Sequence, residues 1–173
     1  MIGWRPARLA FAAILLVAAL LRAAFFIGLV SGDPQDDGIY YSQALAIYAS
    51  GGNNLDRFRD PPPNHLYNPI DQFPLRPMVI YPVAAAFFLF GPGEVAATLW
   101  AFLCSLVTAG LVYRIGTLVD GRSTGLLAAL LCAFYPLEVI NATRILSDVQ
   151  VGMFAALALL LVLEGFRRDR ASL

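Results

Sequence analysis

Four long apolar segments leave this chain little freedom in how it can fold. They run over Leu9–Val30, Glu94–Val119, Thr124–Ile140 and Ile145–Phe166, and the first is interrupted only by Arg22. A helix that crosses the ~30 Å hydrocarbon core of a bilayer uses about 20 residues. Hydrophobic residues make up 59% of the chain and charged residues only 14%, too few to cover a soluble domain of this size. The composition excludes a soluble enzyme, a nucleic-acid-binding protein and a disordered chain, and it predicts an integral membrane protein.

A polar stretch, 31–76, separates the first apolar segment from the rest. It holds six of the eleven prolines and six of the twelve acidic residues, and it is too polar to cross a bilayer. The segment that follows, Pro77–Phe90, is apolar but short for a full crossing. We interpret it as an interfacial or re-entrant helix, because the basic residues then fall on one side of the membrane.

The distribution of arginines sets the topology. If Pro77–Phe90 does not span, the positive-inside rule places the basic groups together in the cytoplasm: Arg5, Arg8, Arg114, Arg122, Arg167, Arg168 and Arg170. We therefore predict one all-α integral membrane domain over 1–173, with about four transmembrane helices and both termini cytoplasmic. Residues 31–93 form a large external loop that includes interfacial helices near 37–50 and 77–90. A signal peptide is disfavoured because the first run is long and has no obvious cleavage site after it.

The external loop contains a short amphipathic pattern. An acidic pair, Asp36-Asp37, precedes it and Gly51-Gly52 follows it as a helix stop. Apolar or aromatic residues recur on one helical face: Tyr40, Ala44, Ile47 and Tyr48. This pattern predicts a helix that lies on the membrane surface, with Tyr40, Tyr41 and Tyr48 at headgroup depth.

The acidic pair has a structural and a functional interpretation. Aspartate is a favoured N-cap and suits the positive end of a helix dipole. One cap needs only one carboxylate, however, so the other carboxylate would be an acceptor close to the bilayer surface. The residues alone leave both interpretations open for Asp36 and Asp37.

Four motifs in register resemble a known family. Asp36-Asp37-x-x-Tyr40, followed by Ala44 and Gly51, resembles the first external loop of GT-C-fold glycosyltransferases, the relatives of protein O-mannosyltransferases and of the lipid A aminoarabinose transferase. The other three motifs are Leu75-Arg76-Pro77-Met78-Val79-Ile80-Tyr81-Pro82, Phe88 to Ala97, and Tyr135-Pro136-Leu137 followed by Ile145-Leu146-Ser147-Asp148. Met78 replaces a second proline of the family pattern, and Thr98 stands where an arginine is frequent.

The resemblance covers the N-terminal third or so of a typical member. We therefore expect this chain to be part of a longer transferase and to be inactive alone.

The resemblance implies inverting transfer of a sugar from a polyprenyl-phosphate donor at the external, periplasmic face of the inner membrane. It assigns Asp36 as the base that takes the acceptor's proton, Asp37 as a cap or substrate-orienting group, and Asp148 as a second acidic residue at the same face. The expected substrate-binding residues are Arg22, Tyr40, Arg76 and Arg144, since guanidinium groups suit a phosphate.

Each of these residues also has a structural alternative. Asp148 could cap its helix or pair with Arg144 at i,i+4 spacing, and Arg22 could snorkel to the interface. No residue is predicted to bind a metal. His65 fits no recognised ligand pattern. No cofactor is assigned, and a divalent cation requirement is left open.

The expected partners are the polyprenyl-phosphate sugar donor, the lipid bilayer and a glycan, lipid or protein acceptor, without nucleic acid. A second hypothesis is a small polytopic transporter subunit or a non-catalytic membrane scaffold, because four spans with acidic groups facing one side would suit either. The DNA downstream of Leu173 discriminates, since further hydrophobic spans there would favour the transferase.

Overall fold

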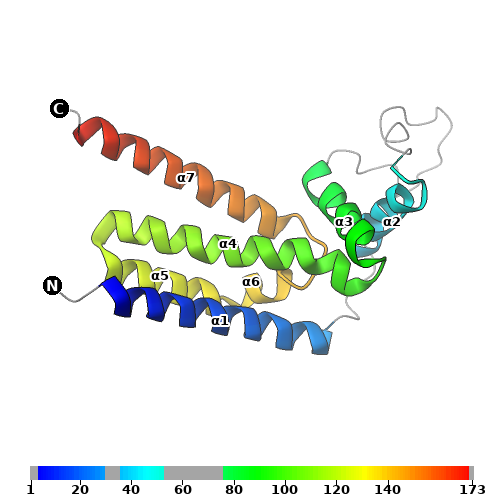
Figure 1. The fold of residues 1–173 in the computed structure, drawn as a ribbon, viewed down its shortest axis with the longest axis horizontal. Helices are drawn as coiled ribbons and strands as arrows, with labels where there is room; N and C mark the ends of the chain where they lie inside the picture. Colours follow the sequence, from blue (N-terminus) through cyan, green and yellow to red (C-terminus); the bar gives the residue numbers. More distant parts are fainter. Residues whose placement is uncertain (1–3, 30–35, 53–75, 172–173) are drawn as a thin grey trace.

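The computed structural model describes residues 4–29, 36–52 and 76–171, without the side chains of residues 4, 5, 27–29, 36 and 169–171. These ranges hold only helices and their connections (Figure 1). The helices are α1 (Trp4–Leu29), α2 (Asp36–Ala49), α3 (Pro77–Phe90), α4 (Glu94–Asp120), α5 (Arg122–Phe134), α6 (Pro136–Asn141) and α7 (Asp148–Ala171).

Three of these helices, α1, α4 and α7, are long and apolar enough to cross a membrane. Their candidate spans are Pro6–Phe26, Glu94–Asp120 and Asp148–Arg168. Large apolar side chains are exposed along them, for example Leu16 and Leu161. An apolar exterior on long helices is what lipid tails require and what water disfavours. The structure thus confirms the predicted all-α membrane protein.

The fourth predicted crossing, Thr124–Ile140, is not one helix. It breaks at Tyr135, which is extended (φ −64°, ψ 114°) between α5 and α6. Pro136 causes the break, because proline has no N–H to donate and disfavours helical geometry in the residue before it. At about 1.5 Å per residue, α5 and α6 together offer at most about 28 Å. The sequence signal for the break was present, but a continuous span was expected.

Helices α4 and α5 form a hairpin that is tight at two glycines. A Cβ added to Gly116 would lie 2.9 Å from the Cα of Gly125, and one added to Gly125 would lie 2.6 Å from the carbonyl oxygen of Tyr113. Small residues let helices approach closely where lipid provides no hydrophobic driving force between them. The hairpin is therefore held by contact of backbone on backbone.

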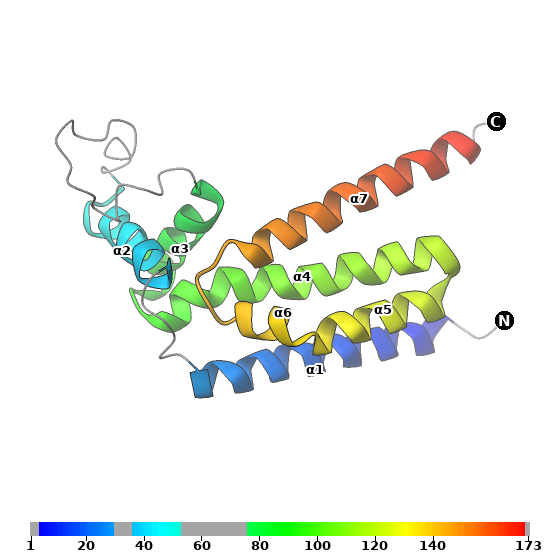
Figure 2. The same cartoon turned by 180° about the vertical axis from the view of Figure 1, so that it is seen from behind.

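The start of α1 and the end of α7 lie at one end of the bundle, and α2 and α3 lie at the other (Figures 1 and 2). Helix α2 ends in a Schellman motif. The Gly52 N–H donates to the Ile47 carbonyl (3.0 Å), the Gly51 N–H donates to the Tyr48 carbonyl (3.1 Å), and Gly51 has a positive φ of 61°. The structure thus confirms the predicted helix stop at Gly51 and Gly52.

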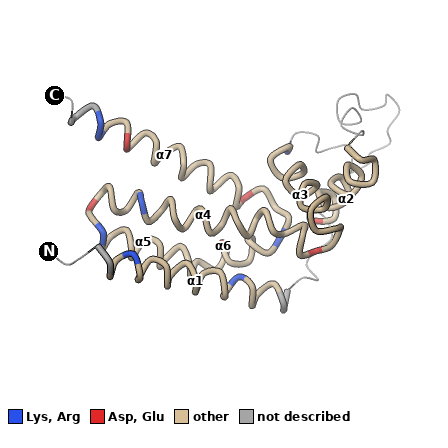
Figure 3. Tube along the Cα trace, in the orientation of Figure 1, with Lys and Arg blue, Asp and Glu red and all other residues tan. Residues whose placement is uncertain are grey.

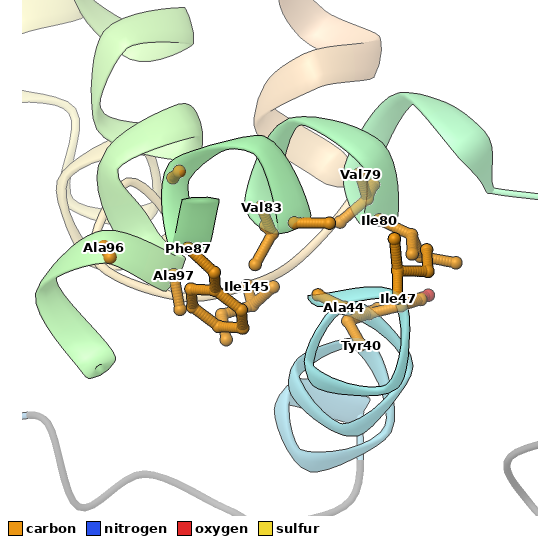
Figure 4. Close-up of a cluster of buried hydrophobic side chains, with 12 residues drawn as sticks. Tyr40, Ala44, Ile47, Val79, Ile80, Val83, Phe87, Ala96, Ala97 and Ile145 are labelled. Carbon is orange, nitrogen blue, oxygen red and sulfur yellow. The ribbon is translucent and has the colours of Figure 1, made fainter. Parts of the chain in front are cut away.

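The apolar face of α2 packs on α3. Tyr40, Ala44 and Ile47 are buried, and the rings of Tyr41 and Tyr48 meet Phe87 edge-on. Figure 4 shows the side chains of α2 and α3 pointing toward one another, with Ile145 from the α6–α7 loop in the same cluster. An apolar face needs an apolar partner, and its sequence does not reveal whether that partner is lipid or protein.

Candidate functional site

An ion pair joins the first turn of α2 to the loop between α6 and α7. The Arg144 Nε donates to Asp37 Oδ2 at 2.9 Å, and the two side chains are 30% and 21% exposed. The other oxygen of this carboxylate, Oδ1, is buried and has no hydrogen-bond partner within the described parts of the chain. Asp37 is therefore a half-paired carboxylate that can accept one more hydrogen bond.

A second arginine lies between the same segments. Arg76, directly before α3, donates through Nη1 to the hydroxyl of Tyr40 and to Ser147 Oγ, the latter at 3.0 Å. The guanidinium carbon also lies 5.6 Å from the centroid of the Tyr40 ring. Tyr40 is one turn after Asp37 on α2. We call Asp37, Tyr40, Arg76, Arg144 and Ser147 the polar cluster.

The loop between α6 and α7 packs on α2 and α3 through the side chain of Ile145. Ile145 is 7% exposed and belongs to the hydrophobic cluster of α2 and α3. Its neighbour Arg144 is thereby brought to α2, although 107 residues separate Arg144 from Asp37 in the sequence. The loop also places Ser147 beside Arg76.

Two predicted acidic residues adjoin the polar cluster. Asp148 is exposed and begins α7, immediately after Ser147. The alternative i,i+4 pair of Asp148 with Arg144 is not formed among the described residues, because Arg144 precedes the helix and pairs with Asp37. Asp36 begins α2, but its side chain lies outside the described residues.

Arg22 is not brought to the polar cluster. Its side chain is 0% exposed. Its Nε donates to Ser105 Oγ (2.8 Å), and its Nη1 donates to the carbonyls of Ala18 (3.1 Å) and Ala133 (3.2 Å). The break at Tyr135 leaves carbonyls of the last turn of α5 without a helical donor. Arg22 satisfies one of them, which matters because a bilayer core supplies no water.

The structure adds residues that the sequence did not single out. Glu138 on α6 interacts electrostatically with Arg22, and its Oε1 is buried without a hydrogen-bond partner in the described residues. An acidic residue inside an apolar run was the available signal for Glu138. Ser147 stood in the fourth motif without an assigned role, and no local signal marked Ser105, because serines are common in membrane helices. Within the ranges that the structure describes, no group of three His, Cys, Asp or Glu residues could hold a metal ion, and His65 lies outside those ranges.

The polar cluster combines one carboxylate that can accept a proton or hydrogen bond with two guanidinium groups that can stabilise a phosphate. It lies at the α2–α3 end of the bundle of apolar helices (Figure 1). These groups suit the class of membrane proteins that bind a phosphorylated ligand.

The comparison with known families agrees with this class. Residues 72–173, more than half of the chain, match the family model described as dolichyl-phosphate-mannose-protein mannosyltransferase. The chain belongs to this family of membrane glycosyltransferases, which use polyprenyl-phosphate sugar donors. No curated protein and no solved structure matches the chain. The predicted family is therefore confirmed. The matched range includes Arg76, Arg144 and Asp148, whereas Asp36 and Asp37 precede it.

Proposed function

We propose that this chain contributes the acceptor-activating and phosphate-binding end of a glycosyltransferase that works at the external face of the membrane. The carrying observation is the Asp37–Arg144 pair with Arg76 beside it, since it brings the acidic start of α2 to the family-matched segment. The donor is a polyprenyl-phosphate sugar, and the acceptor is a glycan, lipid or protein.

The proposed reaction is a single displacement. The acceptor's oxygen or nitrogen forms a bond to the anomeric carbon of the sugar while the bond from that carbon to the phosphate oxygen breaks. Asp36 takes the acceptor's proton, and polyprenyl phosphate leaves with the electron pair. Asp37, held by Arg144, orients the acceptor through its partly exposed carboxylate. Asp148 lies at the same end as a second acidic group.

The arginines stabilise the charge of the leaving phosphate. A guanidinium has five N–H donors, and Arg144 uses its Nε for Asp37. Within the described parts of the chain its terminal nitrogens have no hydrogen-bond partner and can bind an anion, and its partial exposure gives that anion access. Electrostatic stabilisation of a developing charge is commonly the largest catalytic contribution. Arg22, fully enclosed by α1, α4 and α5, is assigned to structure.

The charge distribution supports the proposed orientation. The end opposite the polar cluster carries five described arginines, and the positive-inside rule would place that end in the cytoplasm. They are Arg8, Arg114, Arg122, Arg167 and Arg168.

Cysteine labelling tests this orientation. In whole cells, Ser42→Cys should react with a membrane-impermeant maleimide, whereas Ser123→Cys should react only after permeabilisation. The reverse pattern would overturn the orientation.

Transfer is tested with the gene product as cells make it, supplied with a labelled polyprenyl-phosphate sugar. Asp36→Asn should lower the rate about 10²- to 10⁴-fold, the range for loss of a general base, and Asp37→Asn should lower it less. Glu164→Gln, which removes a paired carboxylate at the far end, is the matched control and should retain the rate. Near-normal transfer by both Asn variants would overturn the proposal.

A further inference from the structure

At the end of the bundle where α1 begins and α7 ends, the described side chains carry an excess of positive charge that the proposed reaction does not use. Arginines of α1, α4, α5 and α7 lie toward this end (Figure 3). The described side chains include only two acids in the same region, Asp120 and Glu164, and Glu164 is paired with Arg114 at 3.0 Å. Topology signals require basic residues at this end, but they do not require them to converge on one place.

Three of these arginines converge on a pocket between α1, α4 and α5. The cavity has a volume of about 320 Å³ and is lined by Arg8, Arg114 and Arg122, together with Ala7, Phe11, Tyr113 and Thr117. The rings of Phe11 and Tyr113 are stacked, with their centroids 4.3 Å apart and their planes 21° apart. This stack joins α1 to α4 and gives the pocket a firm apolar wall.

The lining has the chemistry of a phosphate site at a membrane surface. Guanidinium groups stay charged at all physiological pH values and match the oxygens of a phosphate. The pocket also has an apolar side, formed by Ala7, Phe11 and Tyr113, that can contact the apolar part of a lipid. Basic pockets between transmembrane helices are known to hold acidic lipid headgroups. A soluble anion would make no use of the apolar side of this cavity.

We propose that Arg8, Arg114 and Arg122 form a binding site for the phosphate of an anionic phospholipid, in the leaflet that surrounds this end of the bundle. The site lies at the end opposite the polar cluster and does not depend on the proposed transferase reaction. The bound lipid clamps the N-terminal part of α1 to the α4–α5 hairpin.

Lipid binding by the purified chain in a nonionic detergent tests this site. The probes are dioleoyl phosphatidylglycerol and, as the uncharged reference, dioleoyl phosphatidylcholine, measured by native mass spectrometry. We expect the chain to retain phosphatidylglycerol in preference to phosphatidylcholine. One arginine near an anionic lipid contributes about fivefold in affinity. Arg8→Gln should therefore weaken binding about fivefold, and Arg8→Gln with Arg122→Gln about 25-fold.

The matched control is Arg167→Gln with Arg168→Gln, which removes two arginines from the same end but none from the pocket. It should retain the preference. Equal binding of the two lipids, an equal loss in the control, or full binding by the double pocket variant would each overturn the site. Displacement of the lipid by millimolar inorganic phosphate would show a soluble-anion site instead. If the double variant fails to fold, the fivefold loss of binding expected for Arg8→Gln alone tests the site.

Discussion

Arginines serve two different purposes in the middle of the helix bundle and at its α2–α3 end. Arg22 is 0% exposed and donates to Ser105 and to backbone carbonyls of two helices. Arg144 is 30% exposed and contacts a carboxylate from a distant segment. Both lie in or beside apolar sequence, so the residue type does not distinguish them.

The difference lies in what each guanidinium satisfies. Arg22 satisfies groups that would otherwise be unpaired in a dry interior, so its loss harms the fold. Arg144 holds a carboxylate that keeps one oxygen unpaired among the described residues, so under the proposed function its loss should harm chemistry more than folding. Substitutions in the middle of the bundle should lower the amount of folded protein. Substitutions in the polar cluster should lower transfer while protein remains.

The largest effect is expected for Arg22→Leu. The change leaves the Ala133 carbonyl unpaired and Glu138 without its neighbouring positive charge. Each buried group left unsatisfied costs about 1–3 kcal/mol, enough in sum to remove most of the folded protein. The measurement is the monomer peak of a fluorescent fusion in size-exclusion chromatography. Arg168→Leu, an exposed arginine of α7, should leave this peak unchanged. If the Arg22→Leu protein accumulated normally but lost donor binding, Arg22 would have a functional role and its contrast with Arg144 would be wrong.

Arg144→Glu should have the next largest effect, on function. The new carboxylate would repel Asp37 and any donor phosphate. We expect at least about a 100-fold loss in kcat/KM, corresponding to about 2.7 kcal/mol. Membrane insertion and the monomer peak should stay normal. Loss of the protein itself would assign Arg144 to structure, as for Arg22.

Gly125→Ala tests whether the close approach of α4 and α5 contributes to the stability of the bundle. The added methyl carbon would lie 2.6 Å from the backbone oxygen of Tyr113, so α4 and α5 must separate. Overpacking of this kind costs about 1–3 kcal/mol, and the thermal unfolding temperature should fall. Gly152→Ala is the matched control, because its added carbon meets nothing within 4 Å and alanine favours a helix. An equal fall in both variants would contradict the tight hairpin.

The smallest effect is expected for Tyr40→Phe. It removes the hydroxyl that accepts from Arg76 but keeps the ring in the hydrophobic cluster. Loss of a hydrogen bond to a charged group costs about 1.5–3 kcal/mol, and Ser147 still holds Arg76. We therefore expect a loss of transfer near the lower limit, about tenfold, with at most a small fall in the thermal unfolding temperature. Tyr41→Phe, one residue along, should change neither property.

Local signals predicted most of the helices. Pro77 begins α3 and Gly91 follows it, as the sequence indicated, and Gly51 and Gly52 end α2. These features depend on the backbone preferences of proline and glycine, which act over a few residues. The break at Pro136 is equally local, but the apolar composition around it suggested a continuous span.

Longer-range features could not be predicted in the same way. The pairing of Asp37 with Arg144 depends on how Ile145 packs against α2 and α3, and no periodicity specifies that contact. The sequence placed Arg76, Arg144 and the acidic pair at one end through charge bias alone. Phosphate binding was predicted for Arg22 as well, because a pattern of charges does not show which guanidinium is already hydrogen-bonded within the protein.

The packing of Ile145 has a mechanical consequence. Ile145 and the apolar face of α2 belong to one cluster, so Asp37 and Arg144 are carried by the same packed unit. Long helices tilt when the thickness of the surrounding bilayer changes. The separation of the two charged groups is set within the unit and not by the tilt of α1 or α7. The spacing of the ion pair should therefore be insensitive to the lipids in which the protein resides.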